Sequence, residues 1–183
     1  MIRREETSTS LTPDSTQREV TFIADAMLGR LARWLRFLGF DTVYFPGISD
    51  TRLIRIALEQ NRTFLTRDTR LIRVKGLRSY LLIASDDPFQ QLLETISTFK
   101  LRQFRLLSRC VKCNGNLRKI KDKSEVKDSV PEYVFLHYNL FRKCDDCGKI
   151  YWEGTHPRKF REEIQGIFKD VEPKSADIAR KII

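Results

Sequence analysis

The amino-acid sequence predicts an α/β domain with a mostly parallel sheet flanked by helices, followed by a small cysteine-rich module. Two observations indicate the α/β class. Short apolar runs with the composition of buried strands alternate with longer segments of helical periodicity. The connections between them are short, as in parallel sheets whose strands are joined by helices. The module is predicted from the cysteines, which all follow residue 105 in two CxxC pairs.

The composition describes a soluble globular protein with an excess of positive charge. Of 183 residues, 41% are hydrophobic and only 8 are glycine, which excludes wholesale disorder. Lys and Arg exceed Asp and Glu by 34 to 24, giving a formal charge of +10. Such an excess favours polyanionic partners, nucleic acid first and an anionic membrane second.

The expected location is the cytoplasm, with no membrane partner. No apolar run approaches the ~20 residues that a membrane span requires. Residues 1–19 are rich in Ser, Thr and charge, lack the apolar region of a secretory signal and read as a flexible tail. Closely spaced cysteines in a reducing compartment are more often metal ligands than disulfides.

The first strand and helix place an acid at their junction. Val20–Ala24 has the length and the residue types of a buried strand, and Asp25 follows it directly. Apolar residues then recur at helical spacing from Leu28 to Leu38, and Gly39 reads as the C-terminal cap. In an open α/β sheet this junction is the carboxyl end of a strand, where ligands bind.

The second unit continues the alternation. Asp41–Phe45 is a strand candidate, and a Pro-Gly pair breaks it. Ser49 or Asp50 can cap the helix that follows, because either side chain can accept hydrogen bonds from the first turn. That helix ends near Asn61.

The third and fourth strand candidates also end in acids. Thr63–Thr66 is followed by an arginine and then Asp68. Arg78–Ala84 runs into the pair Asp86 and Asp87. A helical turn is expected between these strands at residues 71–72, and a helix after them over residues 88–99.

The pattern changes after about residue 105. Lys119–Ser129 is a charged run that we expect to form the exposed tip of a hairpin or a loop. Tyr133–Phe141 and Lys149–Trp152 look like strands, and residues 157–170 have the periodicity of an amphipathic helix.

The acids at the strand ends are candidate ligands for a catalytic metal ion. Strand ends that lead into helices lie on one edge of a parallel sheet, so these carboxylates can converge there. Mg²⁺ and Mn²⁺ take oxygen ligands and would stabilise such a cluster. The candidates are Asp25, Asp50, Asp68 and Asp86. The alternative for each is an ordinary cap, and we favour Asp86 over Asp87, which spacing does not separate.

Arginines near the acids are candidate phosphate contacts. Arg30, Arg33 and Arg36 recur every three residues on the helix that follows the first acid, and Arg67 precedes Asp68. A phosphodiester backbone needs cations that hold it while the acids hold the metal. The alternative is an ordinary solvated helix face.

The cysteines predict a structural zinc site. The two CxxC pairs are Cys110 with Cys113 and Cys144 with Cys147, which match four-thiolate tetrahedral coordination of the ribbon type. The intervening residues 114–143 exceed the usual spacing of about 15–20 residues, so we expect an enlarged hairpin. His137 and His156 could substitute as ligands or contact RNA, but a lone histidine is more often structural.

Three stretches resemble a known ribonuclease family. They are FIADAMLGRLARWLRFLGFDT, SDTRLIRIALEQNRTFLTRDTRLI and the CxxC pairs closing with CGKIYWEGTH. Over roughly residues 21–160 they look like the PIN-like family named for the C-terminal domain of the Mut-seven exonuclease. The resemblance implies a PIN-like α/β fold with a zinc ribbon and metal-dependent RNA hydrolysis.

The resemblance also implies roles for three acids. The family's first acid matches Asp25, its helix-start acid matches Asp50, and the acid of its TRD motif matches Asp68. PIN domains more broadly often carry glutamate at the second position, where this chain has aspartate.

The sequence therefore predicts a cytoplasmic Mg²⁺- or Mn²⁺-dependent ribonuclease that hydrolyses RNA phosphodiester bonds endonucleolytically. Structural Zn²⁺ is expected in a ribbon that aids RNA binding. The alternative is a non-catalytic RNA- or ribosome-binding protein that uses the ribbon and the basic surface. A toxin of a toxin-antitoxin pair would share the chemistry. The expected division is a tail at 1–19, a PIN-like nuclease domain at 20–104, a zinc ribbon at 105–156, and a C-terminal helix and tail at 157–183.

Overall fold

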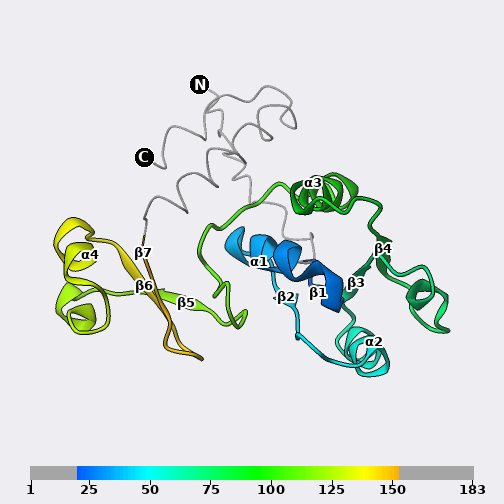
Figure 1. Cartoon of the computed structure of the whole chain (residues 1–183), viewed down its shortest axis with the longest axis horizontal. Coiled ribbons are helices and arrows are strands. Elements are labelled where there is room, and N and C mark those ends of the chain that lie inside the picture. The colour runs from blue at the N-terminus through cyan, green and yellow to red at the C-terminus, as the bar shows by residue number, and fades with distance from the viewer. Residues whose placement is uncertain (1–19, 153–183) are drawn as a thin grey trace, which may run out of the picture.

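The structure, a computed structural model, describes residues 20–152 of the chain. The expected N-terminal tail, the expected helix at 157–170 and His156 lie outside the described residues. A parallel sheet with its flanking helices, the α/β layer, lies beside a smaller antiparallel sheet (Figure 1). None of the helices between residues 20 and 152 is both long and apolar enough to cross a membrane.

The larger sheet is parallel throughout. Its strand order is β2 (Thr42–Val43), β1 (Phe22–Ala24), β3 (Thr63–Thr66) and β4 (Tyr80–Leu82). Three helices accompany it, α1 (Gly29–Phe37), α2 (Asp50–Glu59) and α3 (Pro88–Thr98). Helices α1 and α3 lie on one face and α2 on the other (Figure 1). The predicted α/β class is confirmed.

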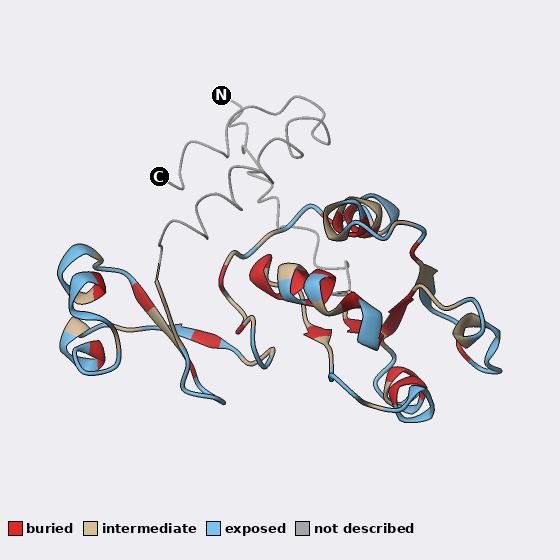
Figure 2. Cartoon of the chain, viewed as in Figure 1, coloured by how far each residue is buried: buried red, intermediate tan, exposed pale blue. Residues whose placement is uncertain are grey.

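Alternate residues of the central strands build two separate cores. Phe22 and Leu65 face α1 and α3, whereas Ile23 and Phe64 face α2. Successive side chains of a strand point to opposite faces of the sheet, so a strand covered on both faces is apolar at every position. All four side chains are fully buried (Figure 2).

The order of the strands reverses between β1 and β3. From β1 the chain passes through α1 to β2 on one side, and from β3 it continues to β4 on the other. Such a reversal leaves a crevice at the carboxyl ends of the two central strands. Asp25 follows β1 there, and Asp68 follows β3 after one intervening residue.

The smaller sheet is antiparallel, in the order β5 (Leu117–Lys119), β6 (Phe141–Cys144) and β7 (Ile150–Trp152). The prediction of a strand over Tyr133–Phe141 is wrong for most of its length. Residues Glu132–His137 form helix α4, and the strand begins at Phe141. This run is apolar at both helical and strand spacing, and Pro131 with Glu132 favours the start of a helix.

The charged run Lys119–Ser129 begins the connection between the antiparallel strands β5 and β6 and is mostly exposed, as expected, but part of it is folded. Lys123–Val126 forms a 3-10 turn, η3, which Asp122 caps by accepting a hydrogen bond from the Ser124 backbone at 2.9 Å. Val126 is fully buried against Val134 of α4 and Phe141 of β6. The long interval between the cysteine pairs therefore encloses a small core of its own.

The segment that leads to the cysteines is fixed to the end of α1. The Arg105 backbone donates to the Leu38 carbonyl at 3.0 Å, and the Leu107 backbone donates to the Phe37 carbonyl at 2.9 Å. Gly39, at φ +97°, permits this approach, because a Cβ atom there would lie 2.5 Å from the Arg105 carbonyl oxygen. Cys110, Leu117 and Cys144 accordingly pack in the same core as α1 and α3.

Candidate functional site

Asp25 is a buried acid at the carboxyl end of β1, with an exposed fraction of 3%. It precedes the 3-10 turn η1 (Ala26–Leu28), and its Oδ1 accepts a hydrogen bond from the Met27 backbone at 2.8 Å. Its Oδ2 accepts from the Arg67 backbone at 3.2 Å and from the Thr66 hydroxyl. Neutral donors from two strand ends thus hold a buried carboxylate in one orientation.

Asp68 contacts the same residue, Thr66, through its backbone. The Thr66 hydroxyl accepts a hydrogen bond from the Asp68 backbone at 3.0 Å while donating to Asp25. The Asp68 carboxylate binds the Arg70 guanidinium, with 2.6 Å between Oδ2 and Nη2. Hydrogen bonds from Arg70 hold the pKa of Asp68 down at about 2, so the carboxylate is ionised at neutral pH.

The acids share an edge of the sheet without forming a closed ligand cluster. Within residues 20–152, no three carboxylates lie with their oxygens all inside 4.8 Å of one another. A shared ion would require Asp68 to turn away from Arg70. Arg70 has a side chain that is 85% exposed, and an ion pair so open to water is readily broken.

Asp50 is exposed at the first position of α2, and Ser49, not Asp50, stands at the N-cap. The alternative role of Asp50 as the cap is therefore wrong. Hydrogen bonds and charge from Asp68, with a smaller contribution from the charge of Asp50, raise the pKa of Arg70. Arg70 is thus within electrostatic reach of both acids.

The structure separates the two acids that follow β4. Asp87 caps α3, because its Oδ1 accepts hydrogen bonds from the Phe89 backbone at 3.0 Å and the Gln90 backbone at 2.9 Å. Asp86 is exposed and is not the cap. This leaves Asp86 as the acid of the pair that is available to a ligand.

Glu94 is an acid at this edge that the sequence reasoning missed. It belongs to α3, and its carboxylate accepts a hydrogen bond from the Ala84 backbone at 3.3 Å, just beyond the end of β4. The acids predicted from the sequence follow strands or open a helix, whereas Glu94 lies in the interior of α3. The available signal was the polar pair Gln91 and Thr95, which are buried in the same helix.

Of the predicted phosphate-binding arginines, Arg30 and Arg33 lie on the surface and Arg67 lies next to Asp68 in the chain. Arg30 and Arg33 are exposed on α1, Arg30 in the first turn beside the η1 junction. Arg67 has a buried Nε with no hydrogen-bond partner within the described part of the chain. Buried donors are normally paired, and the backbone of the same residue donates to the Asp25 carboxylate at 3.2 Å.

Arg36 has a structural role, which corrects its prediction as a phosphate contact. The side chain is 3% exposed. Its Nε donates to the Thr42 carbonyl at 2.8 Å, and its Nη1 donates to the Val111 and Lys112 carbonyls at 3.2 and 2.9 Å. Arg36 therefore ties α1 and β2 to the first cysteine loop.

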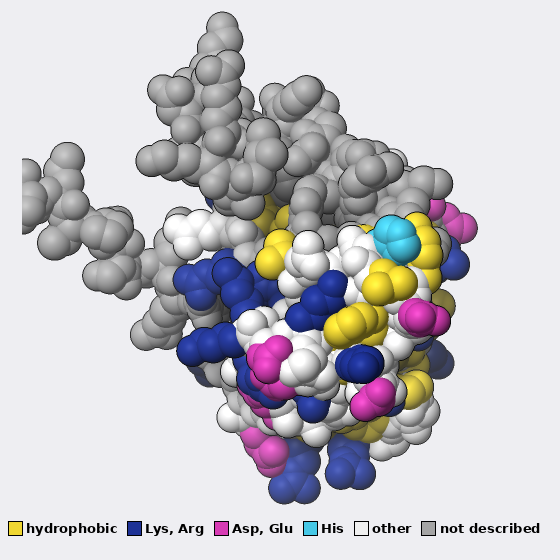
Figure 3. All heavy atoms as spheres, turned by 90° about the vertical axis from the view of Figure 1, so that its left-hand side faces the viewer, with side chains coloured by type: hydrophobic (Ala, Val, Ile, Leu, Met, Phe, Trp, Pro, Cys, Tyr) yellow, Lys and Arg dark blue, Asp and Glu magenta, His cyan; other side chains and the backbone are white. Residues whose placement is uncertain are grey.

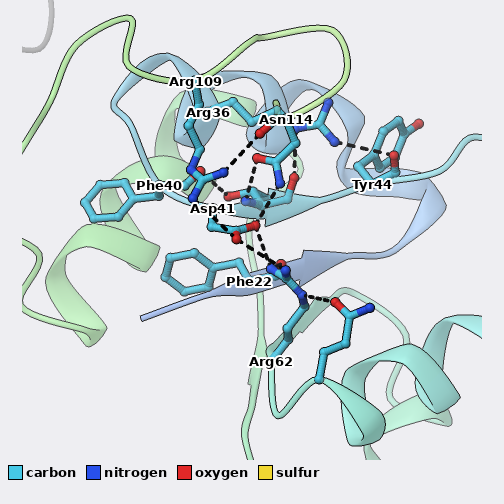
Figure 4. Close-up of polar contacts among 10 residues, drawn as sticks. Phe22, Arg36, Phe40, Asp41, Tyr44, Arg62, Arg109 and Asn114 are labelled. Carbon is cyan, nitrogen blue, oxygen red and sulfur yellow. Dashed lines mark hydrogen bonds and ion pairs between the residues drawn. The ribbon is translucent and has the colours of Figure 1, made fainter. Parts of the chain in front are cut away.

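Asp41 anchors a second connection to that loop, which the sequence reasoning also missed (Figure 4). Its carboxylate binds Arg62 at 2.7 Å, Arg109 at 3.5 Å and the Asn114 amide at 2.7 Å. The side-chain oxygen Oδ1 of Asn114 in turn accepts a hydrogen bond from the Thr42 backbone at 3.0 Å. Burial by itself would raise the pKa of Asp41, but the hydrogen bonds from Arg62 and Asn114 lower it.

The four cysteines form a compact ligand set, as the CxxC pairs predict. The Sγ atoms of Cys110 and Cys147 lie 3.6 Å apart, those of Cys113 and Cys144 3.4 Å apart, and all four lie within 4.8 Å of one another. Tetrahedral zinc with Zn–S bonds of about 2.3 Å separates its sulfurs by about 3.8 Å. The set therefore fits one structural Zn²⁺ with no open position.

The surroundings favour the ionised sulfur that zinc binds at Cys110 but not at Cys113. Burial would raise the pKa of Cys110, but hydrogen bonds, chiefly from the Tyr151 hydroxyl at 3.0 Å, lower it to about 6. Burial, together with hydrogen bonds to the neighbouring sulfurs, raises the pKa of Cys113 to about 12. His137 lies apart on α4, where its Nδ1 is 2.8 Å from the Tyr133 carbonyl oxygen.

Comparison with protein families gives one match over most of the chain. The model of the Mut7-C RNAse domain matches residues 20–164, which include the candidate acids and the cysteines. Comparison with curated proteins gave no match. The chain therefore belongs to the Mut7-C RNAse domain family, and its function is of the ribonuclease type.

Proposed function

We propose that the protein is a metal-dependent endoribonuclease whose active site lies at the crevice between β1 and β3. The observation that supports this most is the pairing of two acids through one hydroxyl. The Thr66 hydroxyl donates to the Asp25 carboxylate and accepts from the Asp68 backbone, and Arg67, between Thr66 and Asp68 in the chain, has a buried Nε without a hydrogen-bond partner among the described residues. Acids that would hold a cation, together with arginines close to them in the chain, suit a phosphodiester substrate.

The acids of this edge would hold Mg²⁺ or Mn²⁺. We propose Asp25, Asp50 and Asp68 as ligands, with Asp86 or Glu94 as the remaining acid. A divalent ion bound there supplies an activated water and stabilises the leaving oxygen. Asp25 needs no movement, because the Met27 and Arg67 backbones and the Thr66 hydroxyl already fix its carboxylate.

The chain's own residues would then place the RNA. If Asp68 held the ion, its carboxylate would leave Arg70, and the Arg70 guanidinium would be released. Arg70 and Arg67 can then contact the phosphate, and Arg30 and Arg33 extend the contact along the exposed face of α1.

We propose that the ribbon aids RNA binding. Basic side chains gather on its surface beside a hydrophobic patch and a histidine (Figure 3). The exposed apolar residues include Tyr133 and Leu136 on α4, at 65% and 64% exposure. Exposed aromatic rings near cations can stack on bases. A reducing compartment such as the cytoplasm would keep the cysteines available for zinc.

Replacing Asp25 by Asn tests the proposal. Asp25→Asn keeps the shape of a buried side chain but removes its charge, so Mn²⁺-dependent cleavage of a structured RNA should be lost. The fold and the zinc content should remain. Asp128→Asn, at an exposed position in the ribbon, is the matched control. Cleavage by the Asp25→Asn variant at the control rate would refute the assignment.

A non-catalytic RNA-binding protein is the second candidate. It is favoured by the absence, among the described residues, of three carboxylates within 4.8 Å of one another. This candidate predicts RNA binding that weakens with salt and is indifferent to Asp25→Asn, with no turnover at any concentration of Mn²⁺.

A further inference from the structure

Tyr44 lies at the same edge of the sheet as the candidate acids. It directly follows β2, which runs parallel to β1, and Asp25 directly follows β1. The register pairs Ile23 with Val43, so the carboxyl ends of the two strands are neighbours. The Tyr44 hydroxyl donates a hydrogen bond to the carbonyl oxygen of Ala26 at 3.3 Å. Tyr44 therefore contacts the backbone of η1, the turn that begins immediately after Asp25.

The turn η1 carries one of the donors that hold the Asp25 carboxylate. The Met27 backbone donates to Oδ1 of Asp25 at 2.8 Å, and the Leu28 backbone donates to the Asp25 carbonyl oxygen at 3.1 Å. Ala26 and Met27 are exposed, so burial of their own side chains does not fix this part of the turn. A contact from outside the turn, such as that of Tyr44, therefore adds to its rigidity.

Gly29 leaves room for the Tyr44 ring. A Cβ atom at Gly29 would lie 2.6 Å from the Tyr44 hydroxyl oxygen and 2.8 Å from Cζ of the ring. The backbone of Gly29 is helical, with φ of −60° and ψ of −31°, so its conformation does not require glycine. Within a helix glycine is less stable than alanine, and Gly29 connects η1 directly to α1. The requirement for glycine is therefore the space that the tyrosine occupies.

Tyr44 is itself held by Arg36 (Figure 4). β2 is an edge strand, and an edge strand presents a row of unpaired carbonyl groups. Nε of Arg36 donates to the Thr42 carbonyl at 2.8 Å, and Nη2 donates to the Tyr44 carbonyl at 3.4 Å. The Tyr44 ring also packs against the core that α1 and α3 share. The tyrosine is thus fixed on the side of β2 and can hold the exposed turn in place.

We propose that Tyr44 is a positioning residue for Asp25. By holding the Ala26 carbonyl and the start of α1, it keeps the Met27 amide directed at the carboxylate. The carboxylate is then ready to bind a cation without rearrangement. The consequence for cation binding rests on the proposed function, whereas the effect of Tyr44 on the carboxylate does not.

Hydrogen exchange of two backbone amides tests the positioning without any catalytic metal. The amides of Met27 and Arg67 both donate to the Asp25 carboxylate, but only that of Met27 lies in the turn that Tyr44 contacts. In the full-length, zinc-loaded protein, Tyr44→Ala should accelerate exchange at Met27 relative to Arg67 by about fivefold or more, the effect of one hydrogen bond. Tyr44→Phe, which keeps the ring, should act in the same direction. A loss of global stability would accelerate both amides, and an unchanged ratio of the two rates in Tyr44→Ala would overturn the proposal.

Gly29→Ala tests the same contact from the side of the helix. The added Cβ should displace the Tyr44 ring and accelerate exchange at Met27, as Tyr44→Ala does. In the Tyr44→Ala background the same substitution meets no ring. It should then leave exchange at Met27 unchanged and raise the Tm, because alanine favours a helix more than glycine does. Additive effects of the two substitutions on the exchange rate would contradict the contact.

Calorimetric titration with Mn²⁺ measures the consequence for the acids. Tyr44→Ala should weaken, by about fivefold or more, the Mn²⁺ binding that Asp25→Asn abolishes. Val43→Ala is the matched control, because it truncates the neighbouring residue, which packs in the core on the opposite face of the sheet. It should lower the Tm without changing the affinity for Mn²⁺. Equal losses of affinity in the two variants would reduce Tyr44 to a general structural role and refute the proposal.

The two measurements separate this proposal from the proposed nuclease. If the wild type binds no Mn²⁺ through Asp25, but Tyr44→Ala selectively accelerates exchange at Met27, the assignment of Tyr44 stands and the nuclease assignment fails. If cleavage in Mn²⁺ depends on Asp25, but the ratio of exchange rates is unchanged in Tyr44→Ala, the reverse holds.

Discussion

The hydroxyl of Thr66 donates a hydrogen bond to the buried carboxylate of Asp25 from the neighbouring strand. The same hydroxyl accepts from the backbone of Asp68, so one side chain sets the relative positions of two acids that are far apart in the sequence. It is fully buried. Loss of the Thr66 hydroxyl should therefore disturb the surroundings of both acids.

Thr66→Val should destabilise the fold and abolish metal-dependent cleavage. Valine has nearly the same shape but leaves Asp25 without one donor, at a cost of roughly 1–3 kcal/mol in the free energy of unfolding. Urea denaturation and cleavage of RNA in Mn²⁺ measure the two effects. Thr66→Ser keeps the hydroxyl and serves as the control. Wild-type activity in Thr66→Val would show that the hydroxyl does not organise the acids.

Arg70→Ala should release Asp68. The arginine holds the pKa of Asp68 at about 2, so its removal should return the pKa toward the ordinary 3.8. An NMR titration of the carboxyl carbon measures this change, and Mn²⁺ should bind more tightly because it no longer displaces a cation. Arg55→Ala, which breaks an exposed pair with Glu59, is the control. An unchanged titration of Asp68 would contradict the pairing.

Arg36→Met should weaken both the fold and the retention of zinc. The substitution leaves the Thr42 carbonyl and the carbonyls of the first cysteine loop without their donor, at a cost on the order of 3 kcal/mol. Zinc release to a chromogenic chelator should accelerate. Arg33→Met, on the exposed face of the same helix, should change neither quantity. Equal zinc release by the two variants would argue against the bridge.

Asp41 should make the stability of the fold depend on pH in the acidic range. Because its folded pKa lies below the ordinary 3.8, the ionised carboxylate stabilises the fold above about pH 4, and this stabilisation is lost as the pH falls through the folded value. Asp41→Asn should lower the Tm near neutral pH, and the difference from wild type should shrink on acidification. Asp128→Asn provides the baseline. A difference that stayed constant with pH would show that Asp41 is not ionised in the network.

Removal of zinc should affect the α/β layer as well as the ribbon. Cys110 and Cys144 pack in the same core as α1 and α3, so the loss of the metal should lower the Tm by more than about 10 °C. Calorimetry before and after chelation measures the change, and zinc, but not Mg²⁺, should restore it. Retention of the full Tm after complete chelation would mean that the cysteines do not stabilise this core.

The alternation of short apolar runs and helical periodicity predicted the α/β class from local information. The same runs predicted that Asp25 and Asp68 lie at the ends of strands. An acid within one or two residues of a buried strand can be recognised from the sequence alone. The CxxC pairs identified the sulfur cluster, since ligand spacing within a knuckle is also local. These features depend only on neighbours in the chain.

Tertiary structure decided what depends on distant partners. Periodicity placed Arg36 on a stripe with Arg33, but only the packing of β2 and the first cysteine loop over α1 made Arg36 internal. The run after Pro131 could be helix or strand until Val126 covered Val134. Glu94 reaches Ala84 only because α3 folds back over the sheet. The sequence by itself determined which residues can form strands, helices and a zinc site, whereas long-range burial determined which polar groups face one another, because desolvation and pairing arise only when separate elements pack.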